Sequence, residues 1–167
     1  DGEGASERAF GSVPIPIDAI EADGTDRLGT GIGEFDRVLG GGLVKGSAIL
    51  IGGDPGIGKS TLLLQVLQNI ASSGCRVLYV SGEESSHQIR MRGSRVGALS
   101  SNLMILVEVS LEAILRQIDT VQPAVVVIDS IQTMYSHAYS SAPGSVAQVR
   151  EASDRLIVQA KKSGTPL

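Results

Sequence analysis

Eight consecutive residues, 53–60, have the types and the spacing of a phosphate-binding loop. Their sequence, GDPGIGKS, fits the pattern G-x-x-x-x-G-K-[ST], in which glycines allow successive backbone N–H groups to face an anion. The Lys59 ammonium would neutralise the terminal phosphates of a nucleotide, and the Ser60 hydroxyl would coordinate Mg²⁺. We therefore expect ATP or GTP to bind the residues of this run and the one after it, namely Gly53, Asp54, Pro55, Gly56, Ile57, Gly58, Lys59, Ser60 and Thr61.

A second acidic position follows an unbroken apolar run at residues 125–128. Asp129 ends this run, and in nucleotide hydrolases with a phosphate-binding loop an aspartate at the end of a buried strand holds Mg²⁺. Aspartate also ends many buried strands as an ordinary turn or cap residue. Its combination with the loop favours the metal role, so we expect Ser60 and Asp129 to be the metal ligands.

Two neighbouring glutamates, Glu83 and Glu84, follow another short apolar run that ends at Val80. The carboxyl ends of parallel strands are where folds of this kind place their sites, and a carboxylate there could polarise an attacking water. The alternative is a pair of solvated glutamates stabilised by the dipole of the helix that follows. The residues alone leave both interpretations open.

A polar segment, 133–144, comes soon after Asp129 and has the length of a binding loop or of a disordered connection. Gln132 could sense the terminal phosphate or could be an ordinary turn residue. Arg90, Arg92 and Arg95 are more easily explained as a solvated helix face than as contacts to a nucleotide base, DNA or a neighbouring subunit.

The elements that must position these residues alternate between strand and helix. Apolar spacing predicts helices over 32–39 and 59–73, from about Ser85 to Val96, from Ser110 onward, and from Ser145 to Gly164. Ser85 with Gln88, and Ser145 with Gln148, have the spacing of capping boxes. Short apolar runs predict strands at 48–51, 76–80, 103–107 and 124–128. This alternation is typical of an α/β fold with a mostly parallel sheet covered by helices on both faces.

The composition fits a globular domain and restricts the function. Hydrophobic residues make up 42% of the 167 residues and charged residues 19%, which allows a sizeable core. A net charge of −4 argues against a protein that simply coats nucleic acid. The single cysteine, Cys75, excludes an internal disulfide, and no apolar run reaches the ~18 residues of a membrane span.

Several longer runs resemble one family, the RadA/Sms group of RecA-related DNA repair proteins of bacteria. The runs are TGIGEFDRVLGGGLVKG at 30–46, GGDPGIGKSTLLLQ at 52–65, VSGEES at 80–85, VIDSIQT at 127–133 and PGSVAQVRE at 143–151. The resemblance covers roughly residues 27–167. RecA itself, replicative helicases and clock ATPases share the phosphate loop but not the LGGGL or PGSVAQVR wording.

The resemblance implies a RecA-like P-loop fold and an ATPase of homologous recombination that uses ATP and Mg²⁺. Such proteins form homo-oligomeric rings on single-stranded DNA, act on recombination intermediates alongside a RecA-type recombinase, and promote branch migration. Glu83 matches the position of the water-activating glutamate, with Glu84 as the runner-up, so Glu83 and Lys59 become the expected catalytic residues. The loop at 133–144 matches the region that contacts DNA, and the cytoplasm, or an organelle, is the implied location.

The resemblance also divides the chain and points to missing parts. We expect residues 1–26 to be a linker or an extended segment, and residues 27–167 to be an incomplete, C-terminally truncated ATPase core. The family's four-cysteine zinc finger is not present, so zinc is expected only outside this sequence. Its KNRFG motif and its protease-like domain would lie beyond Leu167. Nucleotide binding without full motor activity is therefore expected. The alternative is a regulatory RecA-fold ATPase that works through protein partners without DNA.

Overall fold

A three-stranded parallel sheet forms the centre of the fold, as seen in the computed structural model, which describes residues 14, 16–19 and 27–167. The strands are β3 (Val77–Ser81), β4 (Leu103–Val107) and β5 (Val125–Asp129), in the spatial order β4-β3-β5. The register pairs Ser81 with Val107 on one side and with Asp129 on the other. The three strands therefore end together, and the residues after them meet at one edge of the sheet.

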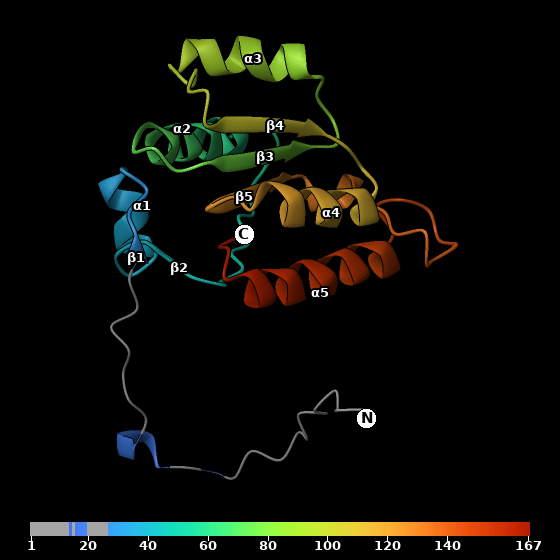
Figure 1. Ribbon diagram of the computed structural model, residues 1–167. Helices are drawn as coiled ribbons and strands as arrows, with labels where there is room; N and C mark the ends of the chain where they lie inside the picture. The colour runs from blue at the N-terminus through green and yellow to red at the C-terminus, as the bar shows by residue number, and fades with distance from the viewer. Residues whose placement is uncertain (1–13, 15, 20–26) are drawn as a thin grey trace, which may run out of the picture.

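Helices cover both faces of this sheet (Figure 1). On one face lie α2 (Lys59–Ser72) and α3 (Ser86–Arg95), and on the other lie α4 (Leu111–Val121) and α5 (Val146–Ser163). Each face has its own apolar cluster, with Leu67 and Ile70 of α2 in the first and Ile114 and Leu156 in the second. Val125 and Val126 of β5 are buried, as expected for a strand covered on both faces. The predicted α/β class and its parallel sheet are confirmed.

The segment that precedes the phosphate loop adds a small antiparallel pair. Strand β1 (Arg27–Leu28) pairs with β2 (Leu43–Val44), and α1 (Gly33–Val38) lies between them in the chain. Of the predicted linker 1–26, residues 1–13, 15 and 20–26 lie outside the described residues. Within the described part, Ile17–Ala19 form a 3₁₀ helix, η1, in which Ile17 is exposed.

The prediction of a strand at 48–51 is wrong, because these residues form no strand in the structure. Its backbone makes two hydrogen bonds with the last residue: Leu167 N–H donates to Ser47 O (2.9 Å), and Ile49 N–H donates to Leu167 O (2.7 Å). Val126 N–H of β5 donates to Pro166 O (3.0 Å). Pro166 and Leu167 therefore lie between β5 and the segment that leads into the phosphate loop.

The helix ends mostly follow the predicted signals. Ser85 and Gln88 form a complete capping box at α3, and Gly164 ends α5 with a positive φ of 71°. The second capping box is only half formed, since Ser145 accepts from Gln148 N–H while the Gln148 side chain turns elsewhere. Ile157 of α5 is 38% exposed, because the buried positions of this helix are Gln148, Ala152, Leu156, Gln159 and Ala160.

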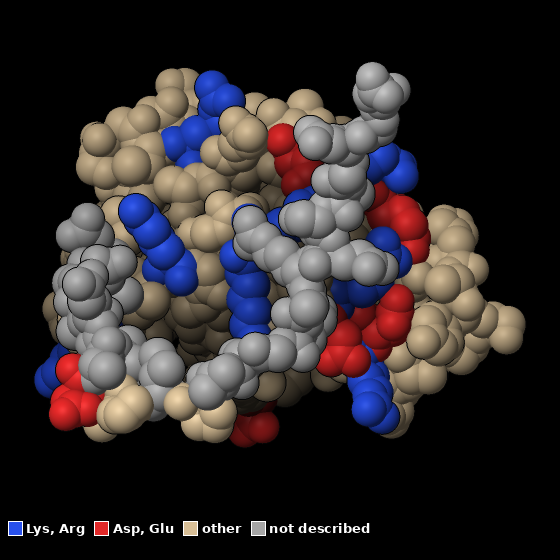
Figure 2. All heavy atoms as spheres, turned by 60° about the horizontal axis from the view of Figure 1, so that its bottom comes forward, with Lys and Arg blue, Asp and Glu red and all other residues tan. Residues whose placement is uncertain are grey.

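Charged side chains are dispersed over the face that carries α5 (Figure 2). Basic and acidic groups mix at one side of this view, and they do not form a single basic stripe on it. Among the described residues, no helix is long and apolar enough to cross a lipid bilayer.

Candidate functional site

A polar cavity of about 230 Å³ lies where β3 and β5 end. Six residues from four parts of the chain line it: Ser60, Ser81, Glu83, Glu84, Arg92 and Asp129. Ser60 comes from the first turn of α2, Asp129 from the end of β5, and the two glutamates follow β3. The fold thus brings the two expected metal ligands, Ser60 and Asp129, and the expected catalytic Glu83 to one cavity.

The phosphate loop leads directly into α2. Gly58 has a φ of 102°, which an L side chain rarely adopts, and α2 begins at Lys59. The first turn of α2 therefore directs its backbone N–H groups toward the loop, where they favour an anion. The Lys59 ammonium donates to Gly53 O (2.6 Å) and Asp54 O (2.9 Å), which holds its charge against the loop.

Asp129 is joined to the strand beside it through Tyr79. The Tyr79 hydroxyl donates to the Asp129 carboxylate and accepts a hydrogen bond from Arg92 (2.9 Å). Burial raises the pKa of Tyr79, and the neighbouring Asp129 carboxylate raises it further. The phenol therefore stays protonated and continues to donate to Asp129, which fixes the direction of that carboxylate.

The two glutamates have different surroundings. Ser81 Oγ, which is buried, accepts from the backbone N–H groups of Glu83 (3.4 Å) and Glu84 (3.1 Å) and so shapes the turn. Glu83 is exposed, and its carboxylate accepts from Ser130 Oγ at 3.0 Å. Glu84 instead forms an ion pair with Arg92 at 2.5 Å.

Gly82 is required in this turn because two neighbours approach it closely. A Cβ at position 82 would lie 2.1 Å from Thr133 Oγ1 and 3.0 Å from a methyl group of Val109. Any side chain there would push the two glutamates away from the segment after β5.

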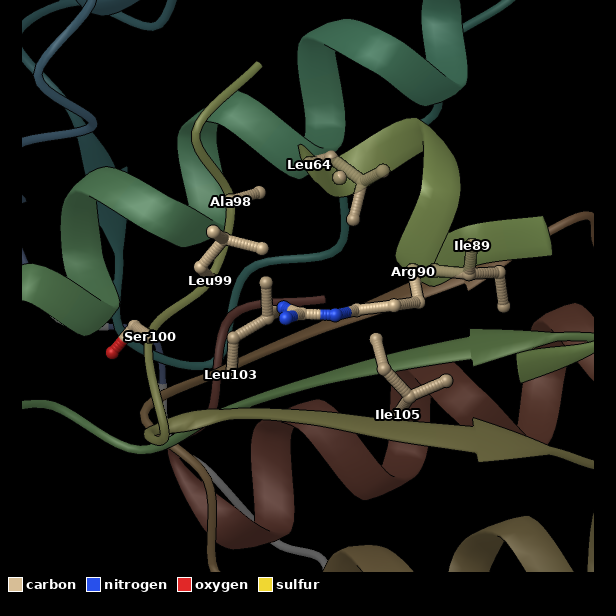
Figure 3. Close-up of a pocket in the computed structure, with 9 residues that line it drawn as sticks. Leu64, Ile89, Arg90, Ala98, Leu99, Ser100, Leu103 and Ile105 are labelled. Carbon is tan, nitrogen blue, oxygen red and sulfur yellow. The ribbon is translucent and has the colours of Figure 1, made fainter. Parts of the chain in front are cut away.

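The three arginines of the predicted solvated helix face have three different environments. Arg95 is exposed, as expected. Arg90 lies along an apolar pocket of about 90 Å³ between α2, α3 and β4, away from the polar cavity (Figure 3). Arg92 points into the polar cavity, so the solvated interpretation is wrong for this residue. Its position three residues after Ile89, the first buried residue of α3, was the signal that could have indicated an inward side chain.

The segment after β5 is ordered, although its polar sequence also allowed a disordered connection. It begins with a 3₁₀ helix, η2 (Ile131–Thr133), and Tyr135 then forms a parallel bridge with Ser110. Gln148 of α5 is buried and contacts the segment at four backbone groups. Its Oε1 accepts from Ser136 N–H (2.8 Å), and the two hydrogens of its Nε2 are shared among the carbonyls of Ser136, Tyr139 and Ser141, which lie 3.0–3.2 Å away.

A charged cluster supports the same segment from α4 and α5. Glu112 accepts from Ser136 Oγ (2.7 Å) and from Arg155 (2.7 Å). Burial acts to raise the pKa of Glu112, but hydrogen bonds from Ser136, from backbone N–H groups and from Arg155 outweigh it and lower the pKa to about 2. Sequence analysis missed this cluster, because Glu112 and Arg155 are 43 residues apart.

Aromatic side chains gather on this segment. Two of the three tyrosines in the chain, Tyr135 and Tyr139, lie within it. Tyr139 is 47% exposed, and the ring of Tyr135 meets that of His137 edge-on at 5.0 Å. His137 and His87 are both exposed, as expected, and Gln132 is exposed as well.

The oxygen ligands at the cavity fit Mg²⁺ in the manner of a nucleotide site. Mg²⁺ is commonly held by one or two carboxylates together with substrate phosphates and waters, so one aspartate and one hydroxyl are enough protein ligands. Within the described residues, no group of three or more histidine, cysteine, aspartate and glutamate side chains is placed to hold a metal ion by itself. Asp129 and Ser60 would therefore act together with a bound phosphate.

Comparisons with known proteins bear on the fold and on the family of the chain. A family model described as "ATPase: KaiC" matches residues 28–106. A solved structure of a KaiC-like protein from the archaeon Pyrococcus horikoshii OT3 superposes with a TM-score of 0.69 at 23% identity, covering 85% of this chain and 70% of that one. At 23% identity the superposition supports a conclusion about the fold alone, which is RecA-like.

Closer sequence relatives are bacterial proteins. The DNA repair protein RadA of Bacillus subtilis (strain 168) is 52% identical over 154 residues, which is 92% of this chain and 34% of the relative. That of Halalkalibacterium halodurans is 50% identical over the same shares of the two chains. The chain thus spans about a third of the length of these relatives.

Proposed function

Because the chain is homologous over nine-tenths of its length to the RadA family of RecA-like ATPases, we propose that it binds ATP and Mg²⁺ and hydrolyses ATP. One observation carries this proposal: Ser60 at the end of the phosphate loop, Asp129 and Glu83 line one polar cavity where β3 and β5 end. The carboxyl ends of parallel strands are the usual place for a nucleotide in such folds.

Each residue of the cavity has a role that its chemistry supports. The loop 53–60 and the start of α2 bind the phosphates through backbone N–H groups, and Lys59 neutralises the terminal phosphates. Ser60 and Asp129 hold Mg²⁺, which supplies charge stabilisation when it is bound. Glu83 orients the attacking water and accepts its proton as the water oxygen bonds to the γ-phosphorus and ADP leaves.

The contacts of the two glutamates favour Glu83 over Glu84 as the base. Glu84 is already paired with Arg92, whereas the carboxylate of Glu83 has only the neutral hydroxyl of Ser130 as its partner. A carboxylate held in an ion pair is less free to turn toward a water than one whose partner is a neutral hydroxyl.

We further infer that the segment 133–144 contacts single-stranded DNA. Exposed Tyr139 and His137 can stack on bases, and such stacking contributes about 1–3 kcal/mol per base independently of sequence. The relatives are named DNA repair proteins, which favours DNA over protein partners alone.

The activity of the whole protein would extend that of this region. We propose that it assembles into a homo-oligomeric ring on single-stranded DNA, cooperates with a RecA-type recombinase, and promotes branch migration as a helicase that depends on ATP. The chain spans only a third of the relatives, so these activities would need segments outside it.

A binding measurement on Lys59→Ala tests the nucleotide site. The variant loses the charge nearest the terminal phosphates, so its affinity for Mg·ATP should fall about tenfold or more, the scale of a charge-assisted contact. Calorimetry on wild type, Lys59→Ala and the control Lys45→Ala, an exposed lysine outside the loop, makes the comparison. Equal affinity of all three would remove the nucleotide assignment.

Phosphate release by the full-length protein, measured with and without single-stranded DNA, then separates an ATPase that depends on DNA from one that does not.

A further inference from the structure

Arg92 joins two parts of the polar cavity that the chain does not connect directly. From α3 its guanidinium pairs with Glu84 at 2.5 Å and donates to Tyr79 Oη at 2.9 Å. The same guanidinium lies 5.9 Å from the centre of the Tyr79 ring. Tyr79 in turn donates to Asp129. A continuous line of polar contacts therefore runs from α3 to the carboxylate expected to hold Mg²⁺.

The burial of this line makes it more than a surface ion pair. Tyr79 is fully buried, and the side chain of Arg92 is only 21% exposed. Surface ion pairs contribute little because their partners move freely in water. Here the guanidinium contacts both Tyr79 and Glu84, and removing either contact would leave a largely desolvated donor or acceptor without its partner.

We propose that Arg92 is a positioning residue that fixes the Asp129 carboxylate through Tyr79 and keeps Glu84 away from the attacking water. The proposal rests on the proposed function of the cavity, because it gives the direction of Asp129 a purpose only if that carboxylate holds a metal. Partners that orient a metal ligand commonly change metal affinity about 10- to 100-fold when they are removed.

The two arms of Arg92 can be separated by substitution. Tyr79→Phe removes the hydroxyl that links Arg92 to Asp129 and leaves the Arg92–Glu84 ion pair. Glu84→Gln removes the charge of that pair and leaves the line to Asp129. Arg92→Gln weakens both arms. Arg95→Ala, at an exposed position of the same last turn of α3, is the matched control.

Calorimetry of ADP binding with and without Mg²⁺ measures the metal contribution without relying on turnover. Tyr79→Phe and Arg92→Gln should each reduce the gain in ADP affinity that Mg²⁺ provides by about tenfold. Binding of ADP without Mg²⁺ should be unchanged in both variants. The melting temperature of the control, Arg95→Ala, should also be unchanged. Because Arg92 acts through Tyr79, the double variant should be no weaker than Tyr79→Phe alone.

Three outcomes have distinct meanings. Loss of ADP binding in Lys59→Ala together with an unchanged Mg²⁺ effect in Arg92→Gln keeps the nucleotide site and overturns the positioning role. Additive losses in the double variant also overturn it, since Arg92 would then act independently of Tyr79. If Arg92→Gln proves too unstable to measure, Arg92→Met, which keeps the apolar part of the side chain and removes the guanidinium, carries the same test: an unchanged Mg²⁺ effect in it would overturn the positioning role.

Discussion

Glu83 and Glu84 are adjacent in sequence, but Glu83 contacts the hydroxyl of Ser130 and Glu84 the guanidinium of Arg92. They therefore offer a direct test of the catalytic assignment. Glu83→Gln keeps the size of the side chain and removes its basicity, so ATP should still bind while hydrolysis is lost by about a hundredfold or more. Glu84→Gln should lower hydrolysis only mildly, because Glu84 is held by Arg92. Phosphate release and nucleotide affinity of both variants, measured in the full-length protein, decide between them. A dead Glu84→Gln beside an active Glu83→Gln would move the catalytic role by one residue.

Sequence alone predicted that Ser60, Asp129 and Glu83 lie near one another, and the structure places them at one cavity, but the sequence did not predict their contacts. The loop 53–60 is recognisable from its own residues and spacing, and Asp129 from the apolar strand that it ends. Tyr79 was treated as an apolar strand residue, and Arg92 as a solvated one. Their hydrogen bond joins two elements whose relative placement depends on packing, and no local pattern reports it.

At the scale of a single element, one side chain of α5, that of Gln148, holds the segment after β5 in place. Replacing it with alanine removes its contacts to Ser136, Tyr139 and Ser141 and leaves the buried N–H and C=O of Ser136 without their partners. We expect a loss of about 2–4 kcal/mol, within the range for disrupting a buried polar network.

Hydrogen exchange and urea unfolding of Gln148→Ala measure this loss. The increase in exchange should be concentrated in residues 134–142, and affinity for single-stranded DNA should fall with it. Gln132→Ala, at an exposed glutamine close to the same segment, is the control and should change neither. Faster exchange spread evenly over the fold would contradict a local role for Gln148.

Glu112 should make the order of the same segment depend on pH. Its pKa is lowered from 4.5 to about 2 in the folded state, so the carboxylate contributes stability that is complete above about pH 4.5 and is lost as the pH falls toward 2. The side chain is 26% exposed, so the contribution is on the order of 2 kcal/mol after solvent screening.

Proteolysis of the segment between pH 6 and pH 3, with a protease active over that range, follows this loss. Wild type should be cleaved progressively faster as the pH falls. Glu112→Gln, which has no carboxylate to protonate, should show a smaller change over the same interval. Parallel pH profiles for the two proteins would rule out Glu112 as the cause.

At the scale of the whole molecule, the phosphate loop is attached to the sheet through the last residues of the chain. Pro166 and Leu167 contact β5 on one side and residues 47–49 on the other by three backbone hydrogen bonds. Leu50, beside this connection, is 86% exposed. The strand predicted at 48–51 failed because apolar character predicts a strand only where a neighbouring strand is available along its length.

Removing residues 165–167 should therefore weaken the connection between the loop and β5. We expect a loss of about 2–4 kcal/mol from the three hydrogen bonds and the buried Thr165 and Pro166. Urea unfolding gives the total, and exchange at the Ile49 amide reports the local effect. Lys162→Ala, at an exposed position in the last turn of α5, should leave both unchanged. An Ile49 amide that stays protected without residues 165–167 would show that another group holds this segment.

The hydrogen bond between Tyr79 and Asp129 also has an optical consequence. The chain contains no tryptophan, so its ultraviolet emission comes from its three tyrosines. A phenol that donates to a carboxylate emits weakly, and Tyr79 is the tyrosine that touches the expected metal ligand. Mg²⁺ bound at Asp129 would draw electron density from the carboxylate that accepts from Tyr79, so the emission of Tyr79 should brighten, while that of Tyr139, which does not contact Asp129, should not. Tyr79 would therefore report binding of Mg²⁺ at Asp129 by its own fluorescence, without an added label.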